Sequence, residues 1–160
     1  MRLLNKLLAL VLLSVAQVGY AAIGGTTAQM EKGLSKYLAE IPQCKAIEIP
    51  EARLLNNGDN AYYSVKGLTS FDMIAELGDG KIKQVTVTSM QDGEEVMRDM
   101  LCMSYAFMRL LQPDLSDREH SLTEAKRLWE LTAQAGKPFK KAHFFNSITG
   151  QLVPVQFVVQ

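Results

Sequence analysis

The chain has 160 residues, of which 48% are hydrophobic, and its 17 Lys and Arg balance its 17 Asp and Glu. This hydrophobic fraction is too high for a disordered chain. The balanced charge argues against a nucleic-acid partner, which would require a basic face.

Residues 1–21 have the features of a secretory signal peptide. Arg2 and Lys6 make a positive start, residues 7–18 form an apolar stretch, and small residues lead to a predicted cleavage site after Ala21. The alternative is a membrane anchor, but the apolar stretch is shorter than the roughly 20 residues that span a bilayer. We therefore predict an exported chain with no membrane span after signal cleavage.

The predicted mature chain, residues 22–160, has the length of one domain with one core. Removing the signal peptide leaves 15 basic against 17 acidic residues, a net charge of −2. We expect this domain to lie in the periplasm or to be secreted.

Residues 26–40 are predicted to form the first helix of this domain. Its core-facing residues recur at spacings of three and four, and Thr26 or Thr27 can cap its start. These core-facing residues are Met30, Leu34, Tyr37 and Leu38. The helix ends before Pro42. Residues 45–49 are a candidate short strand, and residues 52–55 are ambiguous.

Residues 61–68, 70–77 and 81–89 carry the clearest strand signal. Asp79-Gly80 is typical of a two-residue type I′ turn, which sets Leu77 opposite Ile82. The same register would pair Glu76 with Lys83 and Ile74 with Val85. The core face would then contain Phe71, Met73, Ala75, Leu77 and Ile82.

Residues 94–112 are predicted to form an amphipathic helix that begins after Gly93 and ends before Pro113. Its apolar face carries most of the methionines of this region. Its polar face carries Glu94, Glu95, Arg98, Asp99, Tyr105, Arg109 and Gln112.

Cys102 lies in the middle of that polar face, where a cysteine serving only as a small hydrophobe would be unusual. The only other cysteine is Cys44, and exported chains meet an oxidising compartment. We therefore predict a Cys44–Cys102 disulfide that holds the segment around Cys44 across the outside of the helix. A redox pair is the alternative, but the sequence has no C-x-x-C motif.

Residues 121–135 are predicted to form another helix, with Ser121 and Glu124 as a capping box. Two strands follow around a turn at residues 148–151. In the second of them, Val153, Val155, Phe157 and Val159 share a face, and Pro154 favours either an edge position or a bulge. The element order predicts an α+β fold: a single mostly antiparallel sheet of five or six strands with two or three helices packed on one face.

The sequence contains no motif for catalysis, metal binding or a cofactor. His120 and His143 fall on separate elements, and the methionines of residues 90–108 fit a core better than a copper(I) site. Ser104 is an isolated hydroxyl on the apolar helix face, where it is usually satisfied by a backbone carbonyl one turn back. Several carboxylates could meet in space, namely Asp72, Glu76, Glu94, Glu95 and Asp99.

We therefore expect a non-catalytic protein-binding module, such as an inhibitor, immunity factor or accessory envelope protein, without a cofactor. Its partner would be another protein of the cell envelope. The candidate interaction residues are the adjacent Tyr62 and Tyr63, which must point to opposite faces of a strand, together with Val155 and Phe157. One alternative is a small exported hydrolase that uses surface carboxylates. Another is a carrier of a small apolar ligand in a cavity lined by Met97, Met100 and Phe71.

Overall fold

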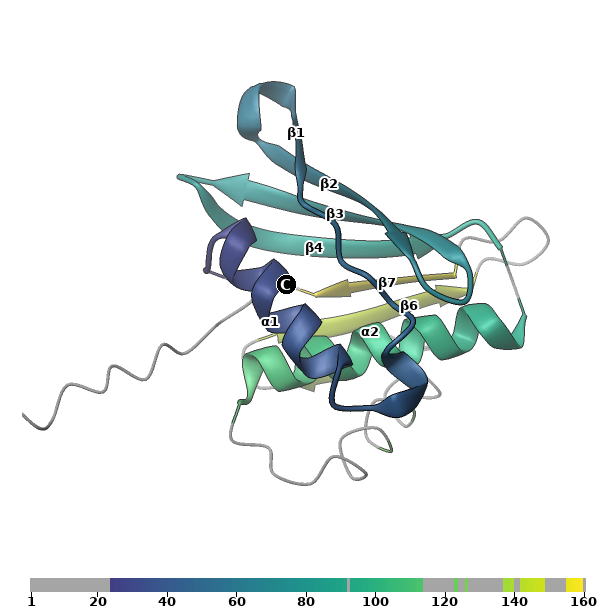
Figure 1. Cartoon of the computed structure of the whole chain (residues 1–160). Coiled ribbons are helices and arrows are strands. Elements are labelled where there is room, and N and C mark those ends of the chain that lie inside the picture. The colour runs from purple at the N-terminus through teal and green to yellow at the C-terminus, as the bar shows by residue number, and fades with distance from the viewer. Residues whose placement is uncertain are drawn as a thin grey trace, which may run out of the picture.

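The computed structural model describes residues 24–91, 93–113, 137–139, 142–148 and 155–159, together with the single residues 123 and 126. Figure 1 shows the elements in space. In chain order they are α1 (Thr27–Leu38), the 3₁₀ turn η1 (Pro42–Cys44), β1 (Arg53–Leu55), the 3₁₀ turn η2 (Asn56–Gly58), β2 (Asn60–Lys66), β3 (Ser70–Gly78), β4 (Lys81–Ser89), α2 (Glu94–Leu111), β5 (Lys137–Phe139), β6 (Ala142–Ile148) and β7 (Val155–Val159).

The strands form one antiparallel sheet in the order β1-β2-β3-β4-β7-β6-β5. The predicted α+β fold with a single antiparallel sheet is confirmed. The sheet has seven strands instead of five or six, because β1 and β5 have three residues each and are too short to show a periodic pattern. The candidate strand at residues 45–49 contributes only an isolated bridge between Glu48 and Lys66.

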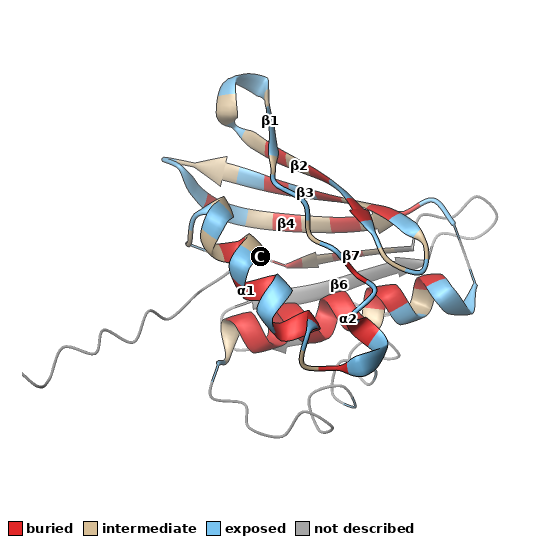
Figure 2. Cartoon of the chain, viewed as in Figure 1, coloured by how far each residue is buried: buried red, intermediate tan, exposed pale blue. Residues whose placement is uncertain are grey.

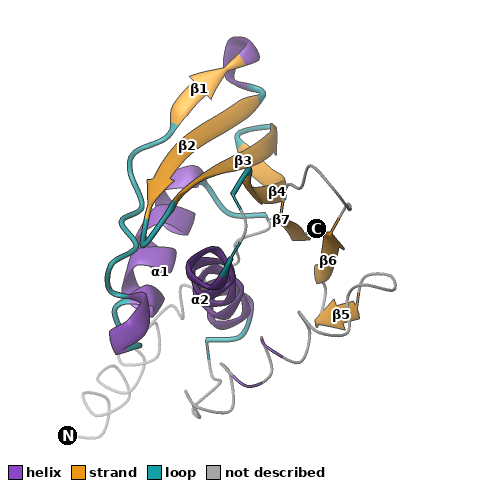
Figure 3. Cartoon of the chain, turned by 90° about the vertical axis from the view of Figure 1, so that its right-hand side faces the viewer, coloured by secondary structure: helices purple, strands orange, loops and turns teal. Residues whose placement is uncertain are grey.

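The sheet is curved, and Figure 3 shows α1 and α2 on its concave side. Alternate residues of the central strands point toward the helices and are buried with them in one core. The strands contribute Ala61, Tyr63, Val65, Phe71, Met73, Ala75, Ile82, Val85, Val87, Phe157 and Val159. Figure 2 shows α2 as the most continuously buried element of the view.

Helix α1 follows its prediction closely. Thr26 is the N-cap, and Gln29 completes a capping box by accepting a hydrogen bond from the Thr26 backbone N–H at 2.9 Å. The predicted core-facing residues are all buried. Gly33 lies where α1 approaches α2, and an added Cβ would come within 2.3 Å of the Leu110 side chain. A glycine at this position therefore permits close packing of the two helices.

The β3–β4 hairpin confirms the predicted turn and corrects the register beyond it. Asp79 and Gly80 have positive φ values of 54° and 71°, and Leu77 pairs with Ile82 as predicted. A bulge follows, so Glu76 pairs with Gln84 instead of Lys83.

The bulge has a packing reason. Without it, Val85 and Val87 would point away from the helices, whereas Ile82 would point toward them. The extra residue lets all three face the core, with Val85 opposite Ala75. Ile74 therefore pairs with Thr86, and its predicted pairing with Val85 is wrong.

Helix α2 has the predicted bounds within one residue, but its predicted polar face is wrong in the middle and last turns. Asp99, Tyr105 and Arg109 are buried, as is Cys102. These residues are buried because other parts of the chain bind this side of the helix. The partners come from the residue Glu40 just after α1, from η1 and from the β2–β3 turn. Glu94, Glu95 and Arg98 remain exposed, as predicted.

The predicted disulfide between Cys44 and Cys102 is confirmed, with 5.5 Å between the two Cα atoms. Both residues are buried. The bond joins η1 to the side of α2, so the segment around Cys44 lies against this helix as predicted.

Of the two predictions for β7, the edge position is wrong, and the alternative, a bulge at Pro154, lies outside the described residues. This strand lies inside the sheet between β4 and β6, and the edges are β1 and β5. Phe157 of β7 is buried and packs edge-on against Phe107 of α2, with 6.1 Å between ring centroids. The β6–β7 hairpin therefore completes the core from the end of the chain.

The predicted signal peptide lies outside the described residues. So does the predicted helix at 121–135, apart from Thr123 and Lys126, which are helical. None of the helices in the described ranges has the length and hydropathy that a bilayer span requires.

We expect replacement of both cysteines by alanine to lower the free energy of unfolding by about 4 kcal/mol, because the bond closes a long loop in the unfolded chain. The two residues are separated by 58 positions. Urea unfolding of the C44A/C102A variant and of the wild type measures the difference. Two titratable thiols in denatured, unreduced wild-type protein would contradict the disulfide itself.

Candidate interaction surface

The outer face of the sheet is the side that faces away from α1 and α2. Among the elements that the structure describes, no helix covers this face (Figure 3). Its side chains are exposed or half-buried. They belong to Asn60, Tyr62, Ser64, Lys66, Ser70, Asp72, Ile74, Glu76, Gln84, Thr86, Thr88, Gln156 and Val158.

One row of residues crosses the outer face from strand to strand. The strand registers place Arg53, Tyr62, Ile74, Thr86 and Val158 side by side, in that order. Ile74 is 39% exposed at the middle of this row. The row therefore brings an aromatic ring, an isoleucine and a valine together on a surface that no described helix covers.

The two carboxylates of the outer face are bound by uncharged neighbours. The Tyr62 hydroxyl donates to Asp72 Oδ1 at 2.6 Å, and the Gln84 amide donates to Glu76 Oε1 at 3.0 Å. Hydrogen bonding to Asp72, with a smaller effect of burial, raises the pKa of the Tyr62 phenol, so this donor stays protonated at neutral pH.

Both edges of the sheet are poorly suited to pairing with another strand. β1 is three residues long and follows Pro50, and β5 is three residues long and contains Pro138. Short edge strands, charged residues and proline are the usual means by which proteins prevent edge-to-edge association. Edge pairing, which the sequence suggested for the C-terminal strand, therefore has little support.

Tyr63 points into the core, opposite to Tyr62, as the strand period requires. It is 1% exposed, and its hydroxyl donates to Glu31 Oε1 at 3.1 Å. Burial, followed by the nearby Glu31 carboxylate, raises the pKa of the Tyr63 phenol. The same Glu31 oxygen accepts the backbone N–H of Ala52 at 3.3 Å, so this group also anchors the start of β1.

The four predicted interaction residues therefore do not form one surface. Tyr62 lies on the outer face, while Tyr63 and Phe157 belong to the core. The side chain of Val155 lies outside the described residues. Sequence reasoning missed Ile74, although its place between the core residues Met73 and Ala75 was the signal that it points outward.

A partly buried charged cluster joins the segment just after α1 to the last turns of α2. Glu40 accepts a hydrogen bond from the Tyr105 hydroxyl at 2.9 Å, and it forms an ion pair with Arg109 at 3.4 Å. The Arg109 side chain is 10% exposed, and its guanidinium lies 5.0 Å from the centre of the Tyr37 ring. Its Nε and Nη1 atoms have no hydrogen-bond partner among the described residues.

Asp99 of α2 binds the turn between β2 and β3. Its carboxylate accepts the backbone N–H groups of Leu68 at 3.2 Å and Thr69 at 2.8 Å, and also the Thr69 hydroxyl at 2.9 Å. An added Cβ on Gly67 would lie 2.8 Å from the Asp99 oxygens, so a glycine is needed where the turn approaches the carboxylate.

Three of the carboxylates considered for a hydrolase site bind different neighbours, and the other two, Glu94 and Glu95, are exposed in the first turn of α2. Asp72 and Glu76 lie on the outer face, whereas Asp99 is buried against the β2–β3 turn. In the described part of the chain, no three His, Cys, Asp or Glu residues are placed to hold a metal ion. Ser104 donates to the Met100 carbonyl at 2.9 Å, which accounts for its hydroxyl.

Two surface pockets accompany the disulfide-linked segment. One, of about 270 Å³, is lined by Gln43, Cys44, Arg98, Leu101, Cys102, Thr123 and Lys126. The other, of about 280 Å³, lies between α1 and residues 45–49. Neither is lined by the residues proposed for a ligand cavity, and two of these, Met100 and Phe71, are buried in the core.

Comparisons with models of protein families, with curated proteins and with solved structures find no match to this chain.

We expect Glu40→Gln to lower the free energy of unfolding by about 1–3 kcal/mol, because it leaves the largely buried Arg109 cation without its counter-charge while part of the site remains open to solvent. Urea unfolding measures this loss. Glu51→Gln, at an exposed position, is the matched control and should change stability by less than about 0.5 kcal/mol. Equal losses in the two variants would contradict a structural role for the ion pair.

We expect Tyr63→Phe to be less stable than the wild type by about 1.5–3 kcal/mol at pH 8, since it loses a hydrogen bond to a carboxylate. The Tyr63 pKa is higher in the folded state than in the unfolded state, so this stabilisation is lost as pH rises above about 10. Urea unfolding between pH 8 and 11 should therefore show the two stabilities converging. Parallel curves would contradict this assignment.

Proposed function

We propose that this protein is an exported, non-catalytic protein-binding module that binds another protein of the cell envelope through the outer face of its sheet. The observation that supports this most directly is the row through Tyr62 and Ile74 on a face that no described helix covers. The face combines partly exposed apolar side chains with uncharged hydrogen-bonding groups.

The composition of the outer face favours a protein partner. The centres of protein interfaces are depleted of charged residues and enriched in aromatic ones. Here Tyr62 and Ile74 lie near the middle, the two acids are hydrogen-bonded to neighbours, and Arg53 and Lys66 lie at the periphery. Because both edges of the sheet are short and flanked or interrupted by proline, binding by the face is favoured over strand addition.

Export is supported by the signal-peptide features and by the disulfide, which is typical of oxidising compartments. The fold is also compatible with the predicted cleavage after Ala21. Gly24 donates its backbone N–H to Ile82 at 2.7 Å, and Ile82 donates to Gly25 at 2.9 Å. These hydrogen bonds involve only residues after the predicted cleavage site, so the mature chain would retain them.

The test uses the mature protein and envelope extract. We expect a stoichiometric partner to be captured by the wild type, and Ile74→Asp to weaken that capture at least about tenfold, because a charge would enter the middle of the interface. The retained fraction over a concentration series measures the effect.

Leu54→Asp is the matched control. Leu54 is 60% exposed, but it pairs with the inward-facing Ala61 and therefore lies on the other side of the sheet. It should capture the partner like the wild type, with both variants folded by circular dichroism. Recovery of no partner by the wild type, or equal capture by Ile74→Asp, would count against the proposal.

A further inference from the structure

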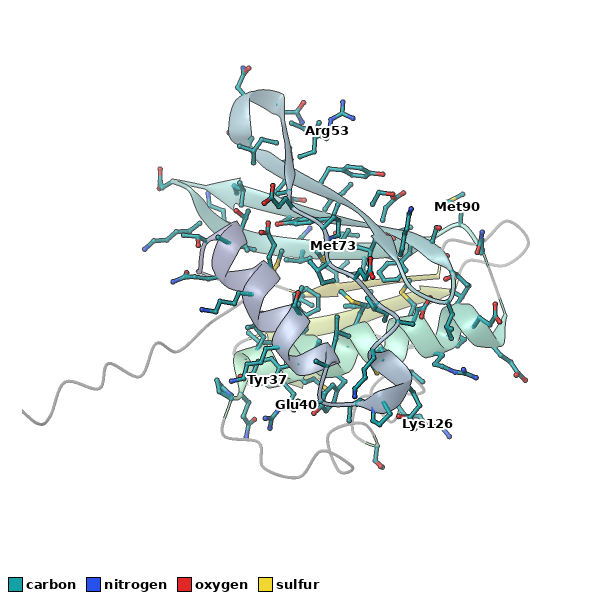
Figure 4. The ribbon with its side chains drawn as sticks, in the orientation of Figure 1. Tyr37, Glu40, Arg53, Met73, Met90 and Lys126 are labelled. Carbon is teal, nitrogen blue, oxygen red and sulfur yellow. A yellow bond between two sulfur atoms is a disulfide. The ribbon has the colours of Figure 1, made fainter. Side chains whose placement is uncertain are left out.

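Two exposed apolar side chains lie at one end of the sheet. Leu68 of the β2–β3 turn is 40% exposed, and Met90, which follows β4, is 76% exposed. Lys66 pairs with Ser70, and Asp72 with Thr88, so Met90 continues β4 to the level of Ser70 beside this turn. Figure 4 labels Met90 at this end of the molecule. We call these two side chains the apolar tip.

Leu68 is held in place by a buried group. Its own backbone N–H donates to Asp99, as do the N–H and hydroxyl of Thr69. Gly67 closes the turn by donating its N–H to the Thr69 carbonyl at 2.8 Å. The turn therefore presents an exposed leucine on a backbone fixed by α2, at a place where turns usually carry small polar residues.

The backbone beside Met90 is also anchored. Ser89 is buried, and its hydroxyl accepts the N–H of Gln91 at 3.1 Å. The Met90 side chain itself lies outside the core. Leu68 and Met90 thus share one end of the sheet and are each held by a neighbouring buried residue.

We propose that the apolar tip anchors the envelope partner by inserting into an apolar pocket on that protein. This inference rests on the proposed function and adds the shape and chemistry of the partner's site. An apolar side chain on a pre-ordered turn loses little conformational freedom on binding, which is the property of interface anchors. The flexible thioether of Met90 adapts to the wall of such a pocket.

A lipid surface fits the apolar tip less well. Glu94 and Glu95 are exposed in the first turn of α2, four and five residues after Met90. Anionic lipid headgroups would repel these carboxylates, whereas a protein pocket can have a polar or basic rim.

The test places a photo-crosslinking residue at position 68, 74 or 90 of the exported full chain, with position 54 as control. We expect crosslinked adducts of one common mass from 68, 74 and 90 and none from 54. In the chain labelled at 74, Leu68→Asp and Met90→Asp should each reduce the adduct about tenfold, whereas Leu54→Asp should leave it unchanged.

The outcomes separate the two proposals. An adduct from 74 alone, unaffected by Leu68→Asp and Met90→Asp, would overturn the anchoring role and leave the proposed function standing. No adduct from any position would overturn both. An adduct of two copies of this chain, or binding of the purified protein to vesicles of phosphatidylethanolamine and phosphatidylglycerol that Leu68→Asp abolishes, would also overturn the protein pocket.

Discussion

The burial of the middle and last turns of α2 is the constraint on which the rest of the structure depends. The sheet packs on one side of this helix, and α1 and η1 pack on others, so that its middle and last turns have almost no exposed residues. A helix in this position must satisfy the polar groups that it buries. Three kinds of contact do so: a covalent bond at Cys102, hydrogen bonds at Asp99, and a charge pair at Arg109.

Each of these contacts connects α2 to a different part of the chain. The disulfide reaches the segment after α1, Asp99 reaches the β2–β3 turn, and Arg109 reaches Glu40 at the end of α1. Segments that are far apart in sequence are thus fixed relative to one helix. The outer face of the sheet owes its shape to this arrangement, although none of its residues contributes to the three contacts.

Local signals in the sequence predicted the elements well, and long-range contacts explain what they missed. The capping residue Thr26, the Asp79-Gly80 turn and the pairing of Cys44 with Cys102 each depend on a few residues or on compartment, and all three predictions are confirmed. The bulge between the Leu77–Ile82 and Glu76–Gln84 pairs could not be predicted from the turn, because it is explained only by the burial of Val85 in the core. Polar residues of α2 read as a solvated face because their partners lie 30 to 69 positions away. The choice of Tyr62 over Tyr63 as the outward residue, and its pairing with Ile74, became evident only with the sheet register.

The pairing of an early cysteine with one on α2 has a consequence for biogenesis. A chain that enters an oxidising compartment from its N-terminus delivers Cys44 well before Cys102, because 58 positions separate them. The first thiol must wait for most of the β-meander to emerge. With two cysteines in the whole chain, no incorrect intramolecular bond can form in the interval. On the proposed export route, maturation therefore requires an oxidant for the thiols but no enzyme that reshuffles disulfides within the chain.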